Sequence, residues 1–256
     1  MPTDSSGRLI SPDGAFWWDG TRWEPTAWRQ EYAVLVRPYA SSRLRGELAT
    51  AFLAMLIAVN ILDFINSVLD LAVFPGFLGA GLESNNYLWT QTRNLLVAVS
   101  WLVVAFPGSV VAVGLWVHRV YRNLPALGHQ PATSTAMAVA WFFIPIANLW
   151  KPLQVMREIW RSTLPASSER LVGFWWACWL GGVLIGNLQM QFSIRETTLA
   201  SHTPPLLLSL ASDAVWIAAA WLLINIMRSV TKAQEDVAAR PDTTATKSEP
   251  GLHHAL

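Results

Sequence analysis

The chain has 256 residues, of which 53% are hydrophobic and only 14% are charged. This composition is too apolar for an ordinary soluble domain, and the net charge of +1 predicts no binding to nucleic acid. The apolar residues are gathered into blocks, so the sequence predicts an all-α, polytopic membrane helical bundle.

Residues 1–40 are predicted to form a cytoplasmic, tryptophan-rich hairpin and a linker. Residues 11–23 hold two Asp-Gly pairs beside aromatic residues, a pattern typical of a small β-hairpin. This stretch resembles the short Trp-Asp-Gly-x-x-Trp modules at the ends of many actinobacterial membrane proteins. A role in protein interaction and a role as a membrane-surface anchor both fit it. Residues 1–19 lack the features of a removable signal peptide, so the first span is expected to direct insertion.

Four segments are long and apolar enough to cross a bilayer, which takes about 20 residues. They lie within a predicted transmembrane domain, residues 41–228, and cover residues 48–69, 95–117, 171–192 and 206–227. A polar loop is expected from Ala72 to Thr92. The polar composition of residues 229–256 predicts a disordered cytoplasmic tail.

A fifth apolar segment, residues 133–149, is short and holds Pro145 and Asn148. If this segment does not cross the membrane, nearly all membrane-flanking Lys and Arg residues lie on one side, and only Arg93 and Arg195 lie on the other. Such an excess of positive charge is expected on the cytoplasmic side. A fifth crossing removes this bias. The sequence therefore favours four transmembrane helices and a proline-broken re-entrant segment, with a helix expected over residues 133–144. Five transmembrane helices are the alternative.

Several polar residues inside the spans form a candidate intramembrane polar cluster: Asn60, Asp63, Asn187 and Asp213. An ionised aspartate at the bilayer centre costs at least about 2.5 to 3.5 kcal/mol, so these side chains are expected to face the interior of the bundle. An ion, proton or small-solute site and plain hydrogen bonding between helices are both consistent with this pattern. Cys178, Gly182 and Gly186 form a stripe of small residues that suits close helix packing.

The cytoplasmic side carries a candidate site for an anionic lipid or a protein partner, made of Arg119, Arg122, Asn148, Lys151, Arg157 and Glu158. The same charges are also explained if they serve only to set the topology.

These residues lie in a longer pattern that carries a family resemblance. Residues 116–128, the run Asn148-Leu149-Trp150-Lys151-Pro152 and the Glu and Trp that follow it resemble the bacterial membrane family called domain of unknown function 4328. The resemblance extends over about residues 48–227. The family has no established activity, so the resemblance implies a membrane setting and no catalytic residue.

The sequence contains no zinc-protease, serine-hydrolase or phosphate-loop motif and no paired cysteines. We therefore predict no enzyme, no cofactor and no metal site. The prediction for function is a multi-pass protein of the plasma membrane, with both termini in the cytoplasm, that acts as a non-enzymatic binding or assembly module. The alternative is a homo-oligomeric transporter or channel subunit for ions or small solutes, with Asp63 on the pathway.

Overall fold

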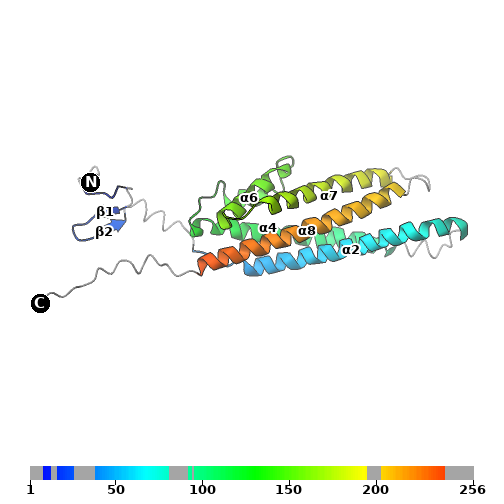
Figure 1. The fold of residues 1–256 in the computed structure, drawn as a ribbon, viewed down its shortest axis with the longest axis horizontal. Coiled ribbons are helices and arrows are strands. Elements are labelled where there is room, and N and C mark those ends of the chain that lie inside the picture. Colours follow the sequence, from blue (N-terminus) through cyan, green and yellow to red (C-terminus); the bar gives the residue numbers. More distant parts are fainter. Residues whose placement is uncertain are drawn as a thin grey trace.

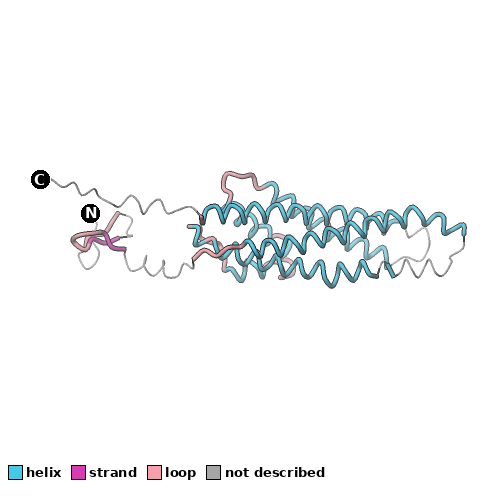
Figure 2. The backbone as a smooth tube through the Cα atoms, turned by 90° about the horizontal axis from the view of Figure 1, so that it is seen from below, coloured by secondary structure: helices cyan, strands magenta, loops and turns pink. Residues whose placement is uncertain are grey.

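The computed structural model of the chain describes residues 8–12, 16–25, 38–80, 92–93, 95–194 and 203–239. Within these residues four helical stretches are long and apolar enough to cross a membrane, which confirms the predicted all-α bundle (Figure 1). They comprise α2 (Arg43–Ala80), the stretch that ends in α4 (Phe106–Asn123), α7 (Arg170–Ile194) and α8 (Thr203–Ala238). Helix α8 packs against α2 and α7, and α2 packs against α4, so the four run side by side (Figures 1 and 2).

The second crossing stretch, Leu95–Asn123, contains a wider helical turn before α4. Residues Ser100–Ala105 form the π-helix η1, and Pro107 follows in the first turn of α4. Proline has no N–H to donate to the carbonyl four residues earlier, and π-helical turns are one way in which a helix absorbs such a break.

The predicted β-hairpin is confirmed. Strands β1 (Phe16–Trp18) and β2 (Trp23–Pro25) are antiparallel, and Trp18 pairs with Trp23. The carboxylate of Asp19 accepts hydrogen bonds from the N–H groups of Arg22 and Thr21, both at 2.7 Å, and these bonds hold the pKa of Asp19 below its usual value. The Asp-Gly pair at residues 13–14 lies outside the described residues.

Residues 133–149 do not form a crossing helix. Helix α5 (Thr135–Ala140) has six residues, about 9 Å at 1.5 Å per residue, and a series of turns follows it. The predicted helix over residues 133–144 is therefore too long at its C-terminal end. Proline disfavours helical geometry in the residue before it, and the chain leaves the helix ahead of Pro145. After the short helix η3 (Ala147–Leu149), α6 (Lys151–Thr163) begins, and no continuous helix supports a fifth crossing here.

Two helices are longer than the sequence predicts. Helix α8 continues to Ala238, ten residues into the segment 229–256 that was predicted to be disordered. Its last turns have partners: Val230 and Gln234 are fully buried, and Gln234 donates a hydrogen bond to the Val120 carbonyl (3.2 Å). Helix α2 continues to Ala80, into the predicted loop that starts at Ala72. Residues 240–256 lie outside the described residues.

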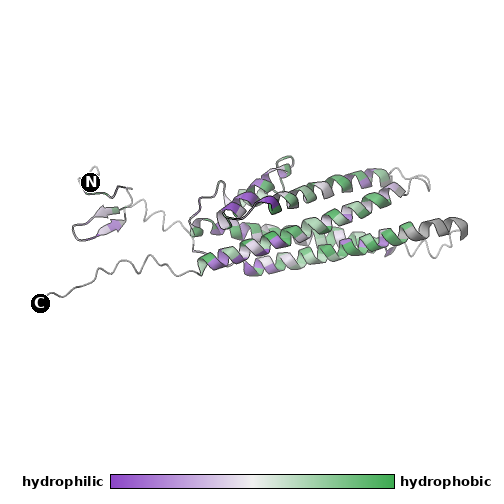
Figure 3. Ribbon diagram, in the orientation of Figure 1, coloured by the Kyte–Doolittle hydropathy of each residue, from purple (hydrophilic) through white to green (hydrophobic). Residues whose placement is uncertain are grey.

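One end of the bundle is hydrophilic (Figure 3). The start of α2 and the ends of α4 and α8 meet there, because Asn123 donates hydrogen bonds to the Ala40 carbonyl (2.9 Å) and to Gln234 (3.4 Å). Helix α6 joins the same end through a hydrogen bond from Tyr121 to Glu158 (2.9 Å). We call this region the polar end of the bundle.

Candidate functional site

Three arginines gather at the polar end, and none of them forms an ion pair with a carboxylate among the described residues. Arg45 comes from the first turn of α2, and Arg119 and Arg122 lie on one face of α4 at helical spacing. Arg45 donates a hydrogen bond to the Leu115 carbonyl (3.1 Å), which fixes it against α4. The charges of Arg119 and Arg122 act on Arg45, and all three charges act on His118. We call these three residues the arginine cluster.

An apolar groove of about 360 Å³ adjoins the arginine cluster between α2 and α4. Arg45 is the charged residue among those that line it; the others are Leu48, Phe52, Pro107, Gly108, Val111, Ala112 and Leu115. Several of these side chains are exposed, so the groove opens on the outer surface of the bundle. We call it the α2–α4 groove.

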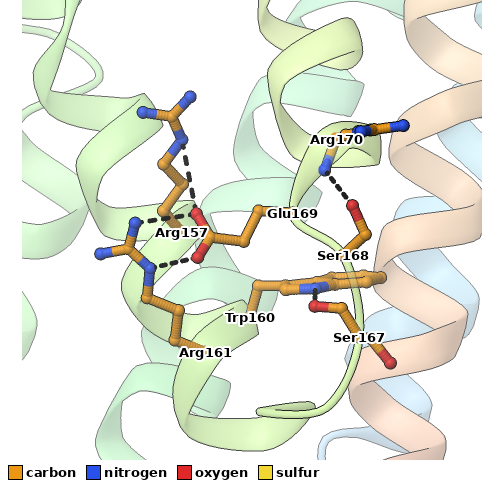
Figure 4. Close-up of polar contacts among 7 residues, drawn as sticks. All are labelled: Arg157, Trp160, Arg161, Ser167, Ser168, Glu169 and Arg170. Carbon is orange, nitrogen blue, oxygen red and sulfur yellow. Dashed lines mark hydrogen bonds and ion pairs between the residues drawn. The ribbon is translucent and has the colours of Figure 1, made fainter.

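The other predicted cations already have partners. Arg161 forms two hydrogen bonds with Glu169, one of them at 2.8 Å, and Arg157 Nε lies 3.8 Å from the same carboxylate (Figure 4). The hydrogen bonds from Arg161 hold the pKa of Glu169 below its usual value, and the charges of Arg161 and Arg157 add to the effect. The Lys151 ammonium lies 5.2 Å from the centre of the Trp141 ring, a cation–π contact.

Glu158 has a structural environment. Its carboxylate accepts hydrogen bonds from the Tyr121 hydroxyl (2.9 Å) and the Ala132 N–H (2.6 Å), and Thr133 N–H donates to the same hydroxyl (3.2 Å). These bonds hold the segment before α5 against α4 and α6. Asn148 lies elsewhere, on the wall of a separate cavity inside the bundle.

The six residues predicted for the cytoplasmic site therefore divide among several environments. Arg119 and Arg122 share the arginine cluster, whereas Lys151, Arg157 and Glu158 are held by Trp141, Glu169 and Tyr121. Arg45 is one of the basic residues that flank the first predicted span, and the sequence does not place it with Arg119 and Arg122. Its place in the cluster depends on which helix packs against the start of α2, and no pattern in the sequence gives that information.

Three of the four residues predicted for the intramembrane cluster lie on α2 and α8: Asn60, Asp63 and Asp213. Ser67 donates to Ser209 across these helices (3.3 Å), and buried Asn60 donates to the Leu56 carbonyl (2.7 Å). Asp213 is 5% exposed, its Oδ2 atom has no hydrogen-bond partner within the described part of the chain, and the charge of Asp63 acts on it.

Asn187 lies apart from this cluster. It is exposed on α7 and donates to the Val183 carbonyl of its own helix (2.7 Å). Gly182 and Gly186 face α8, so a residue one position further along α7 points in a different direction.

The comparison with protein families gives one result. The family described as Domain of unknown function (DUF4328) matches residues 82–232, more than half of the chain. The chain belongs to the DUF4328 family. No curated protein and no solved structure matches it.

The DUF4328 match runs from before α4 to within α8 and includes Arg119, Arg122 and Asp213. It leaves out α2, and therefore Arg45 and Asp63. Among the described residues of this DUF4328 protein, no group of three or more His, Cys, Asp or Glu side chains is placed to hold a metal ion.

Proposed function

We propose that this protein is a non-enzymatic binding module of the plasma membrane that retains an anionic phospholipid at its polar end. The observation that carries the proposal is the arginine cluster, whose three guanidinium groups come from two helices and form no ion pair with a carboxylate in the described chain. Like charges held close together repel, and a bound anion relieves that repulsion.

The chemistry of the cluster matches a phosphodiester headgroup. The guanidinium group is planar and binds phosphate oxygens through two parallel hydrogen bonds, so two or three arginines surround one phosphate well. The α2–α4 groove beside Arg45 is apolar and open to the outside of the bundle, which suits the acyl chain of the same lipid.

The membrane sidedness of the proposal follows from the charge distribution. Basic loops stay in the cytoplasm, and the cytoplasmic leaflet carries anionic lipids. We therefore propose that the polar end and both termini are cytoplasmic, where the arginine cluster meets these headgroups.

Native mass spectrometry of the purified protein tests the lipid site. The triple variant Arg45→Gln/Arg119→Gln/Arg122→Gln is expected to retain phosphatidylglycerol at least about tenfold less well than the wild type, because each basic residue near a membrane surface contributes about 1 kcal/mol. Retention of phosphatidylcholine should not change.

The matched control is Arg157→Gln/Arg161→Gln, which removes two cations that already share Glu169. This variant should keep its phosphatidylglycerol. Equal retention by the triple variant and the wild type would reject the lipid site, and loss of a co-purifying acidic protein instead would identify a protein partner.

A second candidate function is an ion or small-solute transporter or channel subunit. Asp213, which is buried on α8 and on which the charge of Asp63 acts, favours it, because intramembrane carboxylates frequently mark proton and ion pathways. Four helices leave little room for a pathway, so this function needs a homo-oligomer. If Asp63→Asn and Asp213→Asn leave cation and proton flux into proteoliposomes unchanged, this candidate is removed.

A further inference from the structure

A groove of about 670 Å³ lies between α2 and α8 at the polar end of the bundle. It shares no lining residue with the α2–α4 groove, so the two grooves flank α2 on different sides. The helices touch at Gly46 and Thr231, where a Cβ on the glycine would lie 3.3 Å from the threonine hydroxyl oxygen. The buried Trp116 contacts both residues from the interior and donates a hydrogen bond to Thr231 (2.9 Å). We call this feature the α2–α8 groove.

The α2–α8 groove carries charges of both signs that do not neutralise one another across it. Arg228 and Lys232 stand about one helical turn apart on α8 and are exposed. Neither of them forms an ion pair within the described part of the chain. Glu47 lines the same groove from α2, but it pairs with Arg43 of its own helix (2.9 Å). The groove therefore separates two unpaired cations on one wall from a carboxylate on the other.

The character of the groove changes along its length. Glu235, the second carboxylate of the groove, lies beyond Lys232 on α8 and accepts a hydrogen bond from the Ser41 hydroxyl (2.5 Å). Further from the polar end the lining residues are apolar and include Ala51, Ala54 and Met227. A ligand that fits both parts has a charged head and a hydrocarbon chain.

We infer that the α2–α8 groove binds one phospholipid whose zwitterionic headgroup ends in a primary ammonium, the chemistry of phosphatidylethanolamine. Its phosphate lies against Arg228 and Lys232, and its ammonium donates to Glu47. Guanidinium and ammonium groups bind phosphate oxygens, and a carboxylate accepts charge-assisted hydrogen bonds from an ammonium. A zwitterion therefore satisfies both walls of the groove at once, whereas an anion satisfies only one. The inference does not depend on the arginine cluster, which has no carboxylate beside it to hold an ammonium.

Native mass spectrometry of the protein, incubated with equal amounts of dioleoyl phosphatidylethanolamine and dioleoyl phosphatidylcholine, tests this inference. The two headgroups carry the same charges at neutral pH, but the choline ammonium has no N–H group to donate. We expect the wild type to retain the ethanolamine lipid about fivefold better than the choline lipid, the effect of a charge-assisted hydrogen bond in a partly exposed site. Equal retention of the two lipids would overturn the inference.

Variants assign the effect to the groove. Glu47→Gln should remove the preference for the ethanolamine lipid, because it takes the carboxylate from one wall. Arg228→Gln/Lys232→Gln should lower the retention of both lipids, because both carry the phosphate. Ala54→Leu fills the apolar part of the groove and should also lower the retention of both. The control Ala177→Leu makes the same change at an exposed position on α7 and should behave as the wild type.

A preference that survives Glu47→Gln would overturn the inference, and so would wild-type retention of both lipids by Arg228→Gln/Lys232→Gln. These three side chains are exposed, so their variants are expected to fold. The triple arginine variant should keep the preference for the ethanolamine lipid while it loses phosphatidylglycerol. Failure of the α2–α8 site and failure of the arginine cluster are therefore distinguishable.

Discussion

At the scale of single residues, Glu169 shows how one carboxylate joins two helices. It lies just before α7 and binds Arg161 and Arg157 of α6 (Figure 4). Its pKa in the folded protein is lower than its usual value of 4.5, so its contribution to stability is present above about pH 4.5 and is lost as the pH falls through the lowered pKa.

We predict that Glu169→Gln lowers the melting temperature at pH 7 and lowers it less at pH 3, because the wild-type ion pairs are lost as the pH falls through the lowered pKa of Glu169. Melting curves of both proteins at the two pH values give the comparison. Glu47→Gln, which removes an exposed pair with Arg43 on a single helix, serves as the control and should change the melting temperature less. An equal loss at both pH values would show that Glu169 acts through packing.

Tyr121 is the second residue whose role can be tested. Its side chain is fully buried, and its hydroxyl both donates to Glu158 and accepts from Thr133. Tyr121→Phe should lower the free energy of unfolding by about 1 to 3 kcal/mol, because buried partners lose their hydrogen bonds. Unfolding in sodium dodecyl sulfate measures the change.

The Tyr121 hydroxyl and the Ala132 N–H donate to different oxygens of Glu158, and Glu158→Gln keeps only one acceptor oxygen, so one of these hydrogen bonds is lost and the effect should be similar to that of Tyr121→Phe. If the glutamine variant is much the less stable of the two, the charge of Glu158 contributes to stability in addition to its hydrogen bonds.

At the scale of helices, the contact between α7 and α8 depends on one glycine. A Cβ at Gly182 would lie 2.9 Å from the Trp216 ring, closer than such atoms normally approach, whereas a Cβ at neighbouring Gly181 would lie at an ordinary 3.6 Å from Val215. The predicted packing role of the small-residue stripe on α7 rests on this approach.

Alanine substitutions at the two positions should therefore have opposite effects. Gly182→Ala should destabilise the bundle, since the tryptophan has to move, whereas Gly181→Ala should be neutral or stabilising by up to about 1 kcal/mol because alanine favours the helix. Thermal unfolding of the two variants gives the answer. A stable Gly182→Ala protein would show that Trp216 moves without cost.

The turn at Ile146 predicts a substitution that stabilises the protein. Ile146 has φ of +67° and ψ of −56°, and the hydrogen bond from Ala147 N–H to the Pro145 carbonyl (2.8 Å) closes a γ-turn around it. This turn is strained for a β-branched residue, and the side chain is 73% exposed. Ile146→Gly should therefore raise the free energy of unfolding by about 1 kcal/mol or more. Ile146→Val keeps the β-branch and should leave the free energy of unfolding unchanged. A loss of stability in Ile146→Gly would mean that the isoleucine side chain makes an important contact with the membrane.

The sequence predicts some of these elements better than others. Apolar length alone identifies the four long helices, and the Asp19-Gly20 turn identifies the hairpin. The extension of α8 to Ala238 could not be predicted, because its polar last turns are stabilised by contacts with α4, such as the one from Gln234 to Val120. Helix α5 ends earlier than expected because the turn before Pro145 takes up several residues.

At the scale of the whole molecule, several basic residues that the sequence assigns to one membrane side lie near one end of the bundle. Arg45 lies in the first turn of α2, Arg122 in the last turn of α4 and Arg157 in α6, elements that meet at the polar end, and one end of the bundle is hydrophilic (Figure 3). Which of them share a site could not be predicted, because Arg157 Nε lies 3.8 Å from Glu169 of the loop before α7 and Arg45 joins Arg119 through the packing of α2 on α4. The sequence places Asn187 in the intramembrane polar cluster, but its side chain is exposed on α7. Its direction depends on which face of α7 meets α8, and the sequence does not give that face.

The central claim is that the chain crosses the membrane four times and that the segment between α4 and α6 returns to the side from which it started. Ser167 lies in the exposed loop between α6 and α7, and the chain has a single cysteine, Cys178. In a Cys178→Ala background, Ser167→Cys should react with a membrane-impermeant maleimide only after the cells are permeabilised. Labelling of Ser167→Cys in intact cells would place α6 and Arg157 outside and contradict both the topology and the proposed cytoplasmic lipid site.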